Sequence, residues 1–332
     1  MTEESKGPRE IEVTSDDVGR RLDRFLKSRF PKMPRGLLYK LLRERNVTVN
    51  RKKVKVDRTL EDGDRVQLWA DLSGFAADPD RHLQYAHRVR STLAFRRNFR
   101  ILFEDDDLII LNKPAGLVIH PSKMHRKGDT LLDLLRAHLP DAFEKTSPFN
   151  PAFVHRLDRG TSGAVIAAKR HDAAKNLERM FRTREVEKIY VALCLGRIDA
   201  DDGTIDDDIV QVADSSGVSR YRSAARGEGG SEARSVFRVE ERFRDATLVE
   251  VRPDSGRTHQ IRAHFAGVGH PLAGDGDYGR KSVNRNFRED FGLTRVFLHA
   301  AGLTFRHPCR DDEVSVRARL PRDLERVLQG LD

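Results

Sequence analysis

The residues whose types and spacing could do chemistry gather first in one short stretch. Asp158 stands between Arg156 and Arg159, and the turn-forming residues 160–163 follow it. Glycine, serine and threonine favour tight turns, and the apolar run at residues 164–168 then predicts a buried strand. We therefore expect Asp158 at the edge of a strand, facing outward. A carboxylate flanked by two cations suits a nucleophile, but it also suits a plain surface ion pair.

Two other chemistries are possible in the same region. Histidines are numerous, but His259 and His264 are five residues apart and so lie about 140° apart around a helix, on different faces. Ser162 lies near His155 and Asp158, but no Gly-x-Ser-x-Gly turn surrounds it. Phosphate-loop signatures are absent, and residues 274–276, Gly-Asp-Gly, are better explained as a tight turn. We predict no metal site and no serine nucleophile.

Three further segments accompany the Asp158 stretch. Residues 104–116 read Glu-Asp-Asp-Asp-Leu-Ile-Ile-Leu-Asn-Lys-Pro-Ala-Gly, residues 188–190 read Lys-Ile-Tyr, and residues 256–265 read Gly-Arg-Thr-His-Gln-Ile-Arg-Ala-His-Phe. In this order, and together with residues 154–163, they resemble the RluA-type pseudouridine synthases over roughly residues 101–320. Each motif alone is weak evidence, whereas all of them in family order are strong evidence.

The resemblance implies a reaction and a role for each matching residue. Uridine becomes pseudouridine when the bond from ribose C1′ to uracil N1 breaks and the turned base rejoins through C5, so no cofactor is needed. Asp158 would be the nucleophile, at base C6 or at the sugar, and Arg262 its ion-pair partner. Tyr190 would stack on the uracil and is a candidate for removing a proton from it. Arg156, with His155 beside it, would contact the RNA and fill the place that the flipped base leaves.

Charge is distributed unevenly along the 332 residues. Residues 1–100 carry 24 Lys and Arg against 15 Asp and Glu, a net of +9, and the remainder carries 37 against 37. Clustered cations gain affinity for polyanions by releasing counterions, so the first third predicts a module that docks on nucleic acid. Cys194 and Cys309 are too far apart in sequence to suggest a disulfide framework, and we expect buried thiols.

The basic third predicts a small domain at residues 18–70, after an N-terminal tail at residues 1–17. Apolar residues repeat at helical spacing in residues 22–26 and 37–42, and short strands are expected at residues 47–49, 54–56 and 66–68. This pattern resembles an S4 RNA-binding domain, and a basic linker is expected at residues 71–100. The resemblance implies RNA contact by a set of exposed basic side chains: Arg20, Arg21, Arg24, Arg35, Lys40, Arg43, Arg51, Lys52 and Lys53.

The remaining residues 101–332 predict an α+β catalytic domain, because strands outnumber helices and do not alternate regularly with them. The family resemblance implies a mixed, largely antiparallel sheet. Residues 199–208 and 217–230 are expected to be exposed loops or a mobile hairpin. Helices are expected at residues 130–139, 171–184 and 258–266, and strands at residues 108–111, 189–195, 236–239, 247–251, 296–304 and 314–317.

The choice of RNA depends on residues 280–288, a basic and Asn-rich insertion that looks most like the RluC branch of the family. We therefore predict that the substrate is large-subunit ribosomal RNA, at more than one uridine. A transfer RNA substrate, or a catalytically silent RNA-binding or assembly factor, remains an alternative. No uncharged apolar window is long enough to span a membrane, and the N-terminus is charged, so we expect a cytoplasmic protein. We also expect it to be a monomer.

Overall fold

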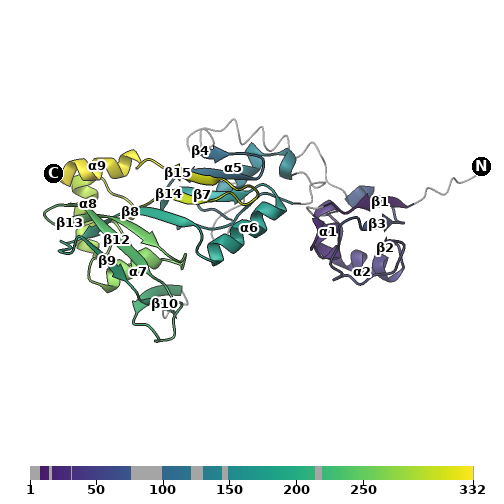
Figure 1. The fold of residues 1–332 in the computed structure, drawn as a ribbon, viewed down its shortest axis with the longest axis horizontal. Coiled ribbons are helices and arrows are strands. Elements are labelled where there is room, and N and C mark those ends of the chain that lie inside the picture. The colour runs from purple at the N-terminus through teal and green to yellow at the C-terminus, as the bar shows by residue number, and fades with distance from the viewer. Residues whose placement is uncertain are drawn as a thin grey trace, which may run out of the picture. The chain divides into compact units, whose positions relative to one another are not determined.

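The computed structural model of this chain describes residues 8–14, 17–30, 32–75, 99–120, 130–143, 149–213 and 219–331. Two compact units can be distinguished (Figure 1). The first comprises the N-terminal region to residue 92, with residues 134–152 and 169–172, and the second comprises the rest. Each is described by itself. Most of the predicted linker, residues 76–98, lies outside the described residues, as does His125, one of the histidines considered above as possible metal ligands.

The N-terminal region forms a three-stranded antiparallel sheet with two helices, α1 (Leu22–Arg29) and α2 (Arg35–Arg43). The strand order is β1 (Arg9–Glu12), β3 (Arg65–Leu68), β2 (Val47–Val49). Apolar residues of both helices and of the two inner faces of β2 and β3 form one buried cluster, which explains the helical spacing in the sequence. The strand β1 lies within the residues assigned above to a tail, and it pairs with β3.

The expected strand at residues 54–56 is wrong, because these residues belong to no strand. Val54 and Val56 are partly buried and pack against the cluster of the N-terminal region. Their alternation reflects burial of every second side chain, and a loop that lies against a core shows the same period as a strand. The alternation therefore predicted correctly which side chains are partly buried, but it did not predict the backbone hydrogen bonding.

The second unit contains a ten-stranded mixed sheet, which confirms the α+β prediction (Figure 1). Along its main path the order is β4, β5, β7, β14, β8, β13, β12, β9, with β15 beside β14 and β6 beside β7. Along the main path and for β15, β14 and β7 run parallel, and the other paired strands run antiparallel. The strands are β4 (Ile101–Glu104), β5 (Leu108–Lys113), β6 (Ala152–Phe153), β7 (Ser162–Ala168), β8 (Glu187–Leu195), β9 (Asp202–Ile205), β12 (Ser235–Arg242), β13 (Ala246–Pro253), β14 (Leu298–Arg306) and β15 (Glu313–Arg317).

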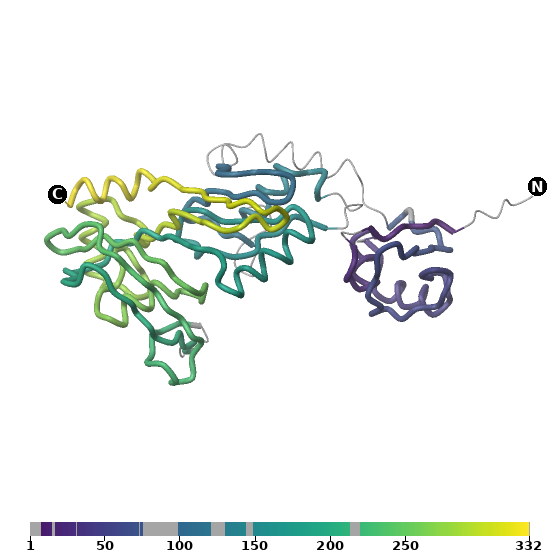
Figure 2. Tube along the Cα trace, viewed as in Figure 1, coloured from purple at the N-terminus to yellow at the C-terminus, as the bar shows by residue number. Residues whose placement is uncertain are grey.

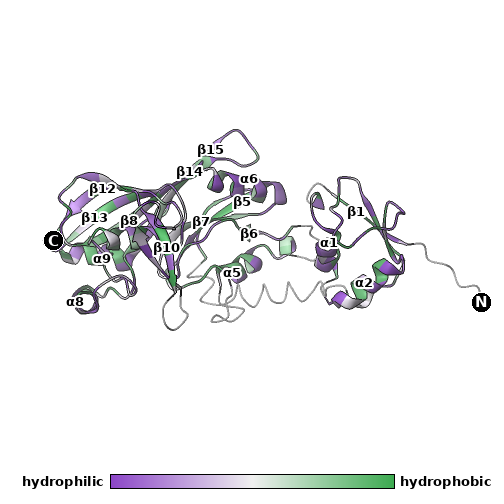
Figure 3. Cartoon of the chain, turned by 90° about the horizontal axis from the view of Figure 1, so that it is seen from below, coloured by the Kyte–Doolittle hydropathy of each residue, from purple (hydrophilic) through white to green (hydrophobic). Residues whose placement is uncertain are grey.

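The late strand β14 lies between strands that come much earlier in the sequence. Figure 2 shows its yellow trace among the teal strands of the first half of the unit. The strand β7 is buried along its whole length, and Figure 3 shows the hydrophobic colour along it. A parallel neighbour on one side and an antiparallel one on the other agree with a strand at the centre of a covered sheet.

Gly163 makes the contact between β7 and β14 possible. Its φ is +119°, and an added Cβ would lie 2.2 Å from the backbone oxygen of Ala300 on β14. A side chain at this position would push the two strands apart, so the glycine of the Thr-Ser-Gly turn is required by packing as well as by conformation.

The helices agree with the sequence where the periodicity is strong. Residues 214–218 lie outside the described part, but the flanking residues form a hairpin of β10 (Asp208–Ala213) and β11 (Ser219–Ala224), as one of the two expectations had it. Residues 280–288 were treated as an insertion, and most of them form a helix instead, with Val283, Phe287 and Phe291 packed at i, i+4 and i+8. The helices are α5 (Leu131–His138), α6 (His171–Arg182), α7 (Gln260–Gly267), α8 (Lys281–Phe291) and α9 (Arg322–Leu331).

The two cysteines differ in their surroundings. Cys194 is buried, as expected, but the expectation for Cys309 is wrong, since it is exposed in the turn between β14 and β15. Among the helices of the described ranges, none is both long and apolar enough to cross a bilayer.

Candidate active site

The Asp158 carboxylate lies on a tight turn immediately before β7. The backbone N–H of Thr161 donates to the backbone oxygen of Asp158 at 3.1 Å, and Gly116 N–H donates to the oxygen of Arg159 at 2.7 Å. Arg295 Nη1 donates to the oxygen of Gly160 at 3.3 Å. Two distant segments therefore hold the turn through its backbone oxygens, one with a backbone N–H and the other with an arginine side chain. The side chain of Asp158 is 19% exposed, which leaves it reachable but poorly hydrated.

Arg262 is the centre of the charged cluster. Its Nη1 donates to Oδ2 of Asp158 at 3.3 Å, which agrees with the pairing implied by the family resemblance. Its Nε and Nη2 donate to the two carboxylate oxygens of Asp275, each at 2.7 Å, and Nη2 also donates to Asp277 Oδ2 at 2.5 Å. This fork uses the planar geometry of a guanidinium and fixes its orientation.

Asp275 and Asp277 were not identified from the sequence as site residues. Oδ1 of Asp275 also accepts from the backbone N–H groups of Asp277 and Tyr278, at 2.9 and 3.2 Å. Burial alone would lower the pKa of Arg262, but the hydrogen bonds and charge of Asp275, with the charge of Asp158, raise that pKa above its usual value. The guanidinium is therefore permanently charged. A Gly-Asp-Gly turn in a sequence gives no sign of the distant arginine that it holds.

The turn that carries Asp275 is itself fixed by α8. Asn284 Nδ2 donates to the backbone oxygen of Asp275 at 2.7 Å, and Asn284 Oδ1 accepts from Gly274 N–H at 3.0 Å. Gly274 has a φ of +71°, and an added Cβ would lie 2.0 Å from the backbone oxygen of Arg295. The helix therefore positions the turn, the turn positions Arg262, and Arg262 contacts Asp158.

His259 and Tyr278 close one side of the cluster. His259 Nε2 lies 3.7 Å from Asp158 Oδ2, and its Nδ1 is hydrogen-bonded to the Tyr278 hydroxyl at 3.1 Å. Burial lowers the pKa of His259, and the charge of Arg262 acts in the same direction, although Asp158 opposes it. The Arg262 guanidinium carbon lies 5.1 Å from the centre of the Tyr278 ring, within cation–π range. Neither residue had been given a role from the sequence.

A narrow pocket of about 70 Å³ opens beside Asp158. Tyr190 on β8 lines it, so the structure brings together the three predicted catalytic residues Asp158, Tyr190 and Arg262. Burial raises the pKa of Tyr190, and the charge of Asp158 raises it further, so the phenol stays protonated. Thr161 also lines the pocket and is 2% exposed, and its hydroxyl has no hydrogen-bond partner among the described residues.

A larger groove of about 800 Å³ adjoins the pocket and shares Asp158, Arg262 and Arg156 with it. Arg159, Arg295 and Arg288 of α8 also line this groove. Arg156 and Arg159 are exposed. The acidic cluster thus has a rim of arginines, a distribution that suits a ligand with an uncharged part and an anionic backbone.

Lys113 at the end of β5 supports the turn from behind. It is fully buried, and its Nζ donates to the backbone oxygens of Leu117, Pro114 and Arg159 at 2.8, 3.0 and 3.4 Å. Burial lowers the pKa of Lys113 to about 7, although the charge of Asp158 opposes this shift. The Asn-Lys-Pro-Ala-Gly motif therefore supports the Asp158 turn through backbone oxygens.

His155 has a different environment from its neighbour Arg156. Its Nε2 accepts from the backbone N–H of Ile166 at 2.9 Å, and its ring stacks on Phe181 with centroids 4.6 Å apart. Burial, with the charge of Lys188, lowers the pKa of His155 to about 3, so the ring is neutral. These contacts tie the motif to β7 and α6, and contact with RNA stays a prediction for His155.

The basic residues predicted to bind RNA in the N-terminal region are exposed with one exception. Arg20 is partly buried and pairs with the buried carboxylate of Asp17 at 3.2 Å. The exposed residues are Arg21, Arg24, Arg35, Lys40, Arg43, Arg51, Lys52 and Lys53.

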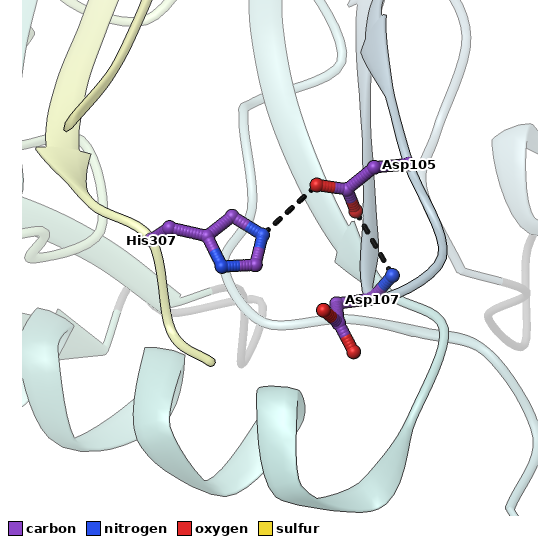
Figure 4. Close-up of side chains that lie close together, drawn as sticks. All are labelled: Asp105, Asp107 and His307. Carbon is purple, nitrogen blue, oxygen red and sulfur yellow. Dashed lines mark hydrogen bonds and ion pairs between the residues drawn. The ribbon is translucent and has the colours of Figure 1, made fainter. Parts of the chain in front are cut away.

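One group of potential metal ligands occurs among the described residues, at Asp105, Asp107 and His307 (Figure 4). His307 Nε2 lies 2.9 Å from Asp105 Oδ2, which also accepts from Arg310 Nη2 at 2.8 Å. The other oxygen, Oδ1, accepts from two backbone N–H groups of the β4–β5 turn. The carboxylate of Asp105 is thus already saturated by donors, and the group is an ion-pair network that joins two loops.

The chain matches the family described as RNA pseudouridylate synthase over residues 107–267, a range that contains Asp158, Tyr190 and Arg262 but not Asp275 or Asp277. It is similar to ribosomal large subunit pseudouridine synthase C of Escherichia coli (strain K12), with 35% identity over all of this chain and 99% of that one. The corresponding protein of Vibrio cholerae is 33% identical over 96% of this chain and 95% of its own length.

A solved structure shares the fold. Human RNA pseudouridylate synthase domain containing 4 superposes with a TM-score of 0.58 at 25% identity, and the match covers 75% of this chain and 97% of that one.

Proposed function

Because this chain belongs to the RluC-type family of ribosomal large subunit pseudouridine synthases, we propose that it isomerises uridines of large-subunit ribosomal RNA with Asp158 as the nucleophile. The observation that carries the proposal is the ion pair of Asp158 with Arg262 at the edge of a pocket that Tyr190 also lines. An ionised carboxylate beside a permanent cation, partly shielded from water, is the arrangement that nucleophilic catalysis by aspartate requires.

The charge of the cluster favours entry of the base first. Asp158, Asp275 and Asp277 carry three negative charges against one on Arg262. A phosphate is repelled by this excess, whereas a neutral uracil is not. The arginines of the adjoining groove, among them Arg156 and Arg159, then contact the phosphates that stay outside.

Extrusion of the uridine from its stack costs a few kcal/mol. Arg156, exposed at the mouth of both cavities, has a planar guanidinium that can stack on the bases left behind while it remains charged beside phosphates. We assign this role to Arg156.

Tyr190 and Thr161 would contact the uracil inside the pocket. The protonated phenol of Tyr190 suits stacking and hydrogen-bond donation better than proton removal, because its pKa lies far above neutrality. The unpartnered hydroxyl of Thr161 can bond a uracil carbonyl or N–H, which would remove the cost of leaving it unsatisfied in the protein. In the isomerisation the C1′–N1 bond breaks, the C1′–C5 bond forms, N1 gains a proton and C5 loses one to solvent.

Large-subunit ribosomal RNA is the substrate that the relatives' names and the basic side chains of α8 both support. Arg280, Lys281, Arg285 and Arg288 are exposed on or beside this helix. We propose that they contact phosphates around more than one target uridine, in the cytoplasm where ribosomal RNA is modified. Pseudouridine maps of total RNA with and without the gene test this choice. Loss of several large-subunit sites is expected, whereas loss confined to a transfer RNA would refute the substrate but not the reaction.

The reaction itself is tested with Asp158→Asn, which keeps the shape and removes the nucleophile. Tritium released from RNA that carries 5-tritiated uridine should fall below detection, while the unfolding temperature and RNA affinity stay near those of the parent. Activity within about tenfold of the parent would exclude Asp158 as nucleophile. Arg262→Lys should also lose most activity, because a point charge cannot contact Asp158 and Asp275 at once.

A further inference from the structure

A hollow on the outer face of the N-terminal sheet has no role in the function described so far. It measures about 520 Å³ and is lined by Trp69, Arg45 and Arg51 around a polar floor of Gln67, Thr48 and Glu10. This volume falls within the range of roughly 300–1,000 Å³ that is typical of small-ligand sites. We propose that the hollow binds one unpaired nucleotide of the RNA substrate, with its base on Trp69 and its phosphate at Arg45 and Arg51. The inference deepens the proposed function, since it depends on RNA being the substrate.

The position of the hollow follows from strand alternation. Val66 and Leu68 of β3 face the buried cluster, so Gln67 faces the other way. Trp69 continues this alternation and lines the hollow with Gln67. The backbone N–H of Trp69 donates to the oxygen of Asn46 at 2.9 Å, which fixes the start of its side chain.

The floor of the hollow is already organised. Oε1 of Gln67, which is 2% exposed, accepts from the Thr48 hydroxyl at 2.9 Å and from the backbone N–H of Arg51 at 2.7 Å. Its Nε2 donates to Glu10 at 3.0 Å. The amide oxygen of Gln67 and its amide nitrogen thus each have a partner among the described residues. A ligand would meet a rigid surface, and little ordering would oppose its binding.

Trp69 and the two arginines supply the recognition chemistry. Trp69 is 57% exposed, the largest fraction among the large apolar side chains noted as exposed in the described ranges. An exposed aromatic ring next to guanidinium groups is the arrangement on which proteins stack unpaired bases and hold their phosphates. Arg45 and Arg51 are both exposed, so their guanidinium groups are accessible to a phosphate.

Positive charge alone would attract an acidic peptide as well as RNA. The aromatic ring next to that charge is what favours RNA as the occupant. Glu10 adds one negative charge to the hollow, but its carboxylate accepts a hydrogen bond from Gln67 and lies 4.0 Å from the Arg65 guanidinium, which offsets the charge. Arg43, Lys52 and Lys53 extend the positive charge beyond Arg45 and Arg51 and are exposed. A polyanion with flat, uncharged rings fits this combination best.

The test uses the full chain, in which Trp69 is the only tryptophan. Its fluorescence therefore reports on this hollow alone. A short single-stranded RNA of eight nucleotides should quench the emission saturably, whereas the same sequence in a duplex should not, because its bases are already stacked. The proposal would be overturned if an acidic peptide quenched the emission and the RNA did not. It would also be overturned if the fluorescence anisotropy of labelled RNA showed binding while the tryptophan emission stayed unchanged.

Variants separate stacking from general charge. Trp69→Ala should weaken binding of the labelled single strand by about 5- to 100-fold, the usual effect of removing one stacked base, and Trp69→Phe should stay near the parent. Tyr39→Ala on α2, which removes another exposed aromatic outside the hollow, is the matched control and should change affinity little. Equal affinity of Trp69→Ala and the parent would disprove the site.

Asp158→Asn distinguishes this proposal from the proposed function. It should stop turnover and leave the quenching of Trp69 emission by RNA intact. Continued turnover would contradict the proposed function, whereas absence of quenching would contradict the proposed nucleotide site.

Discussion

The Thr161 hydroxyl is the residue-scale feature that links structure to substrate most directly. Thr161→Val has nearly the same shape and removes only the hydroxyl, which has no partner among the described residues. The free protein should therefore be as stable as the parent or slightly more so, while kcat/KM for RNA falls about tenfold, the effect of about one lost hydrogen bond.

Thr161→Ser is the control for this prediction, because it keeps the hydroxyl and should recover most of the rate. Unfolding temperature and kcat/KM are measured for both variants. A Thr161→Val enzyme that is destabilised but fully active would mean that the hydroxyl has a structural role only.

His155 gives the protein a dependence of stability on pH. Its pKa of about 3 in the fold lies below the ordinary value of 6.5, so between these values the unfolded chain binds a proton that the folded chain does not. Stability is complete above pH 6.5 and falls as the pH falls toward 3. At pH 5 the loss from this residue is about 2 kcal/mol.

Urea unfolding at pH 7 and pH 5 measures this effect. In His155→Gln the side-chain oxygen can still accept from Ile166 N–H. Between pH 7 and pH 5, the free energy of unfolding of this variant should fall by about 2 kcal/mol less than that of the parent. If both proteins lose the same free energy of unfolding, the titrating group is not His155.

At the scale of elements, α8 acts on the active site through a single side chain. Asn284 holds the Gly274–Asp275 turn by two hydrogen bonds, and Asp275 holds Arg262 by two more. Asn284→Ala should lower kcat about tenfold with little change in KM, because Arg262 loses its fixed orientation while the RNA-contacting surface remains.

Asn286→Ala on the same helix serves as the control, since Asn286 is exposed and does not line the pocket or the groove at Asp158. It should retain parental kcat. Equal kcat for Asn284→Ala and Asn286→Ala would show that the turn keeps its shape without the helix.

The sequence predicted elements well where the apolar pattern is strong, as in the continuous run of β7 or the periodic face of α6, and less well where other features decide. The helix α8 was missed because its apolar residues Val283, Phe287 and Phe291 are separated by charged residues and asparagines, although their spacing of four was a usable signal. Residues 54–56 alternate because of burial without strand pairing.

The same reasoning applies to the candidate site. Asp158, Tyr190 and Arg262 were found because they lie in recognisable motifs, and the structure places all three at one pocket. Asp275 and Asp277 were missed because their role depends on a contact with Arg262 that only the tertiary fold creates. The Gly-Asp-Gly sequence at residues 274–276 was fully explained as a turn, so nothing in the sequence indicated that Asp275 also holds Arg262.

At the scale of the whole molecule, the N-terminal region carries the excess charge. Deletion of residues 1–70 should leave a protein that still isomerises uridine at high RNA concentration but binds more weakly, with a smaller slope of log Kd against log salt. Binding by the parent and by the truncated protein is compared over 50–300 mM salt, roughly the range in which counterion release is easily measured. Identical affinities at every salt concentration would exclude this region as the docking part.

The position of β14 between β7 and β8 also determines when, during synthesis of the chain, the active site can assemble. About 110 residues separate the end of β8 from the end of β14, from residue 195 to residue 306. At about 5–20 residues per second, a ribosome needs on the order of 5–20 s to add them. Until then β7 and β8 present unpaired edges, and Asp158 and Tyr190, which flank the gap, are not held together. A nascent chain is therefore exposed to misassociation while it has no assembled site, and activity begins only after β14 has emerged from the ribosome.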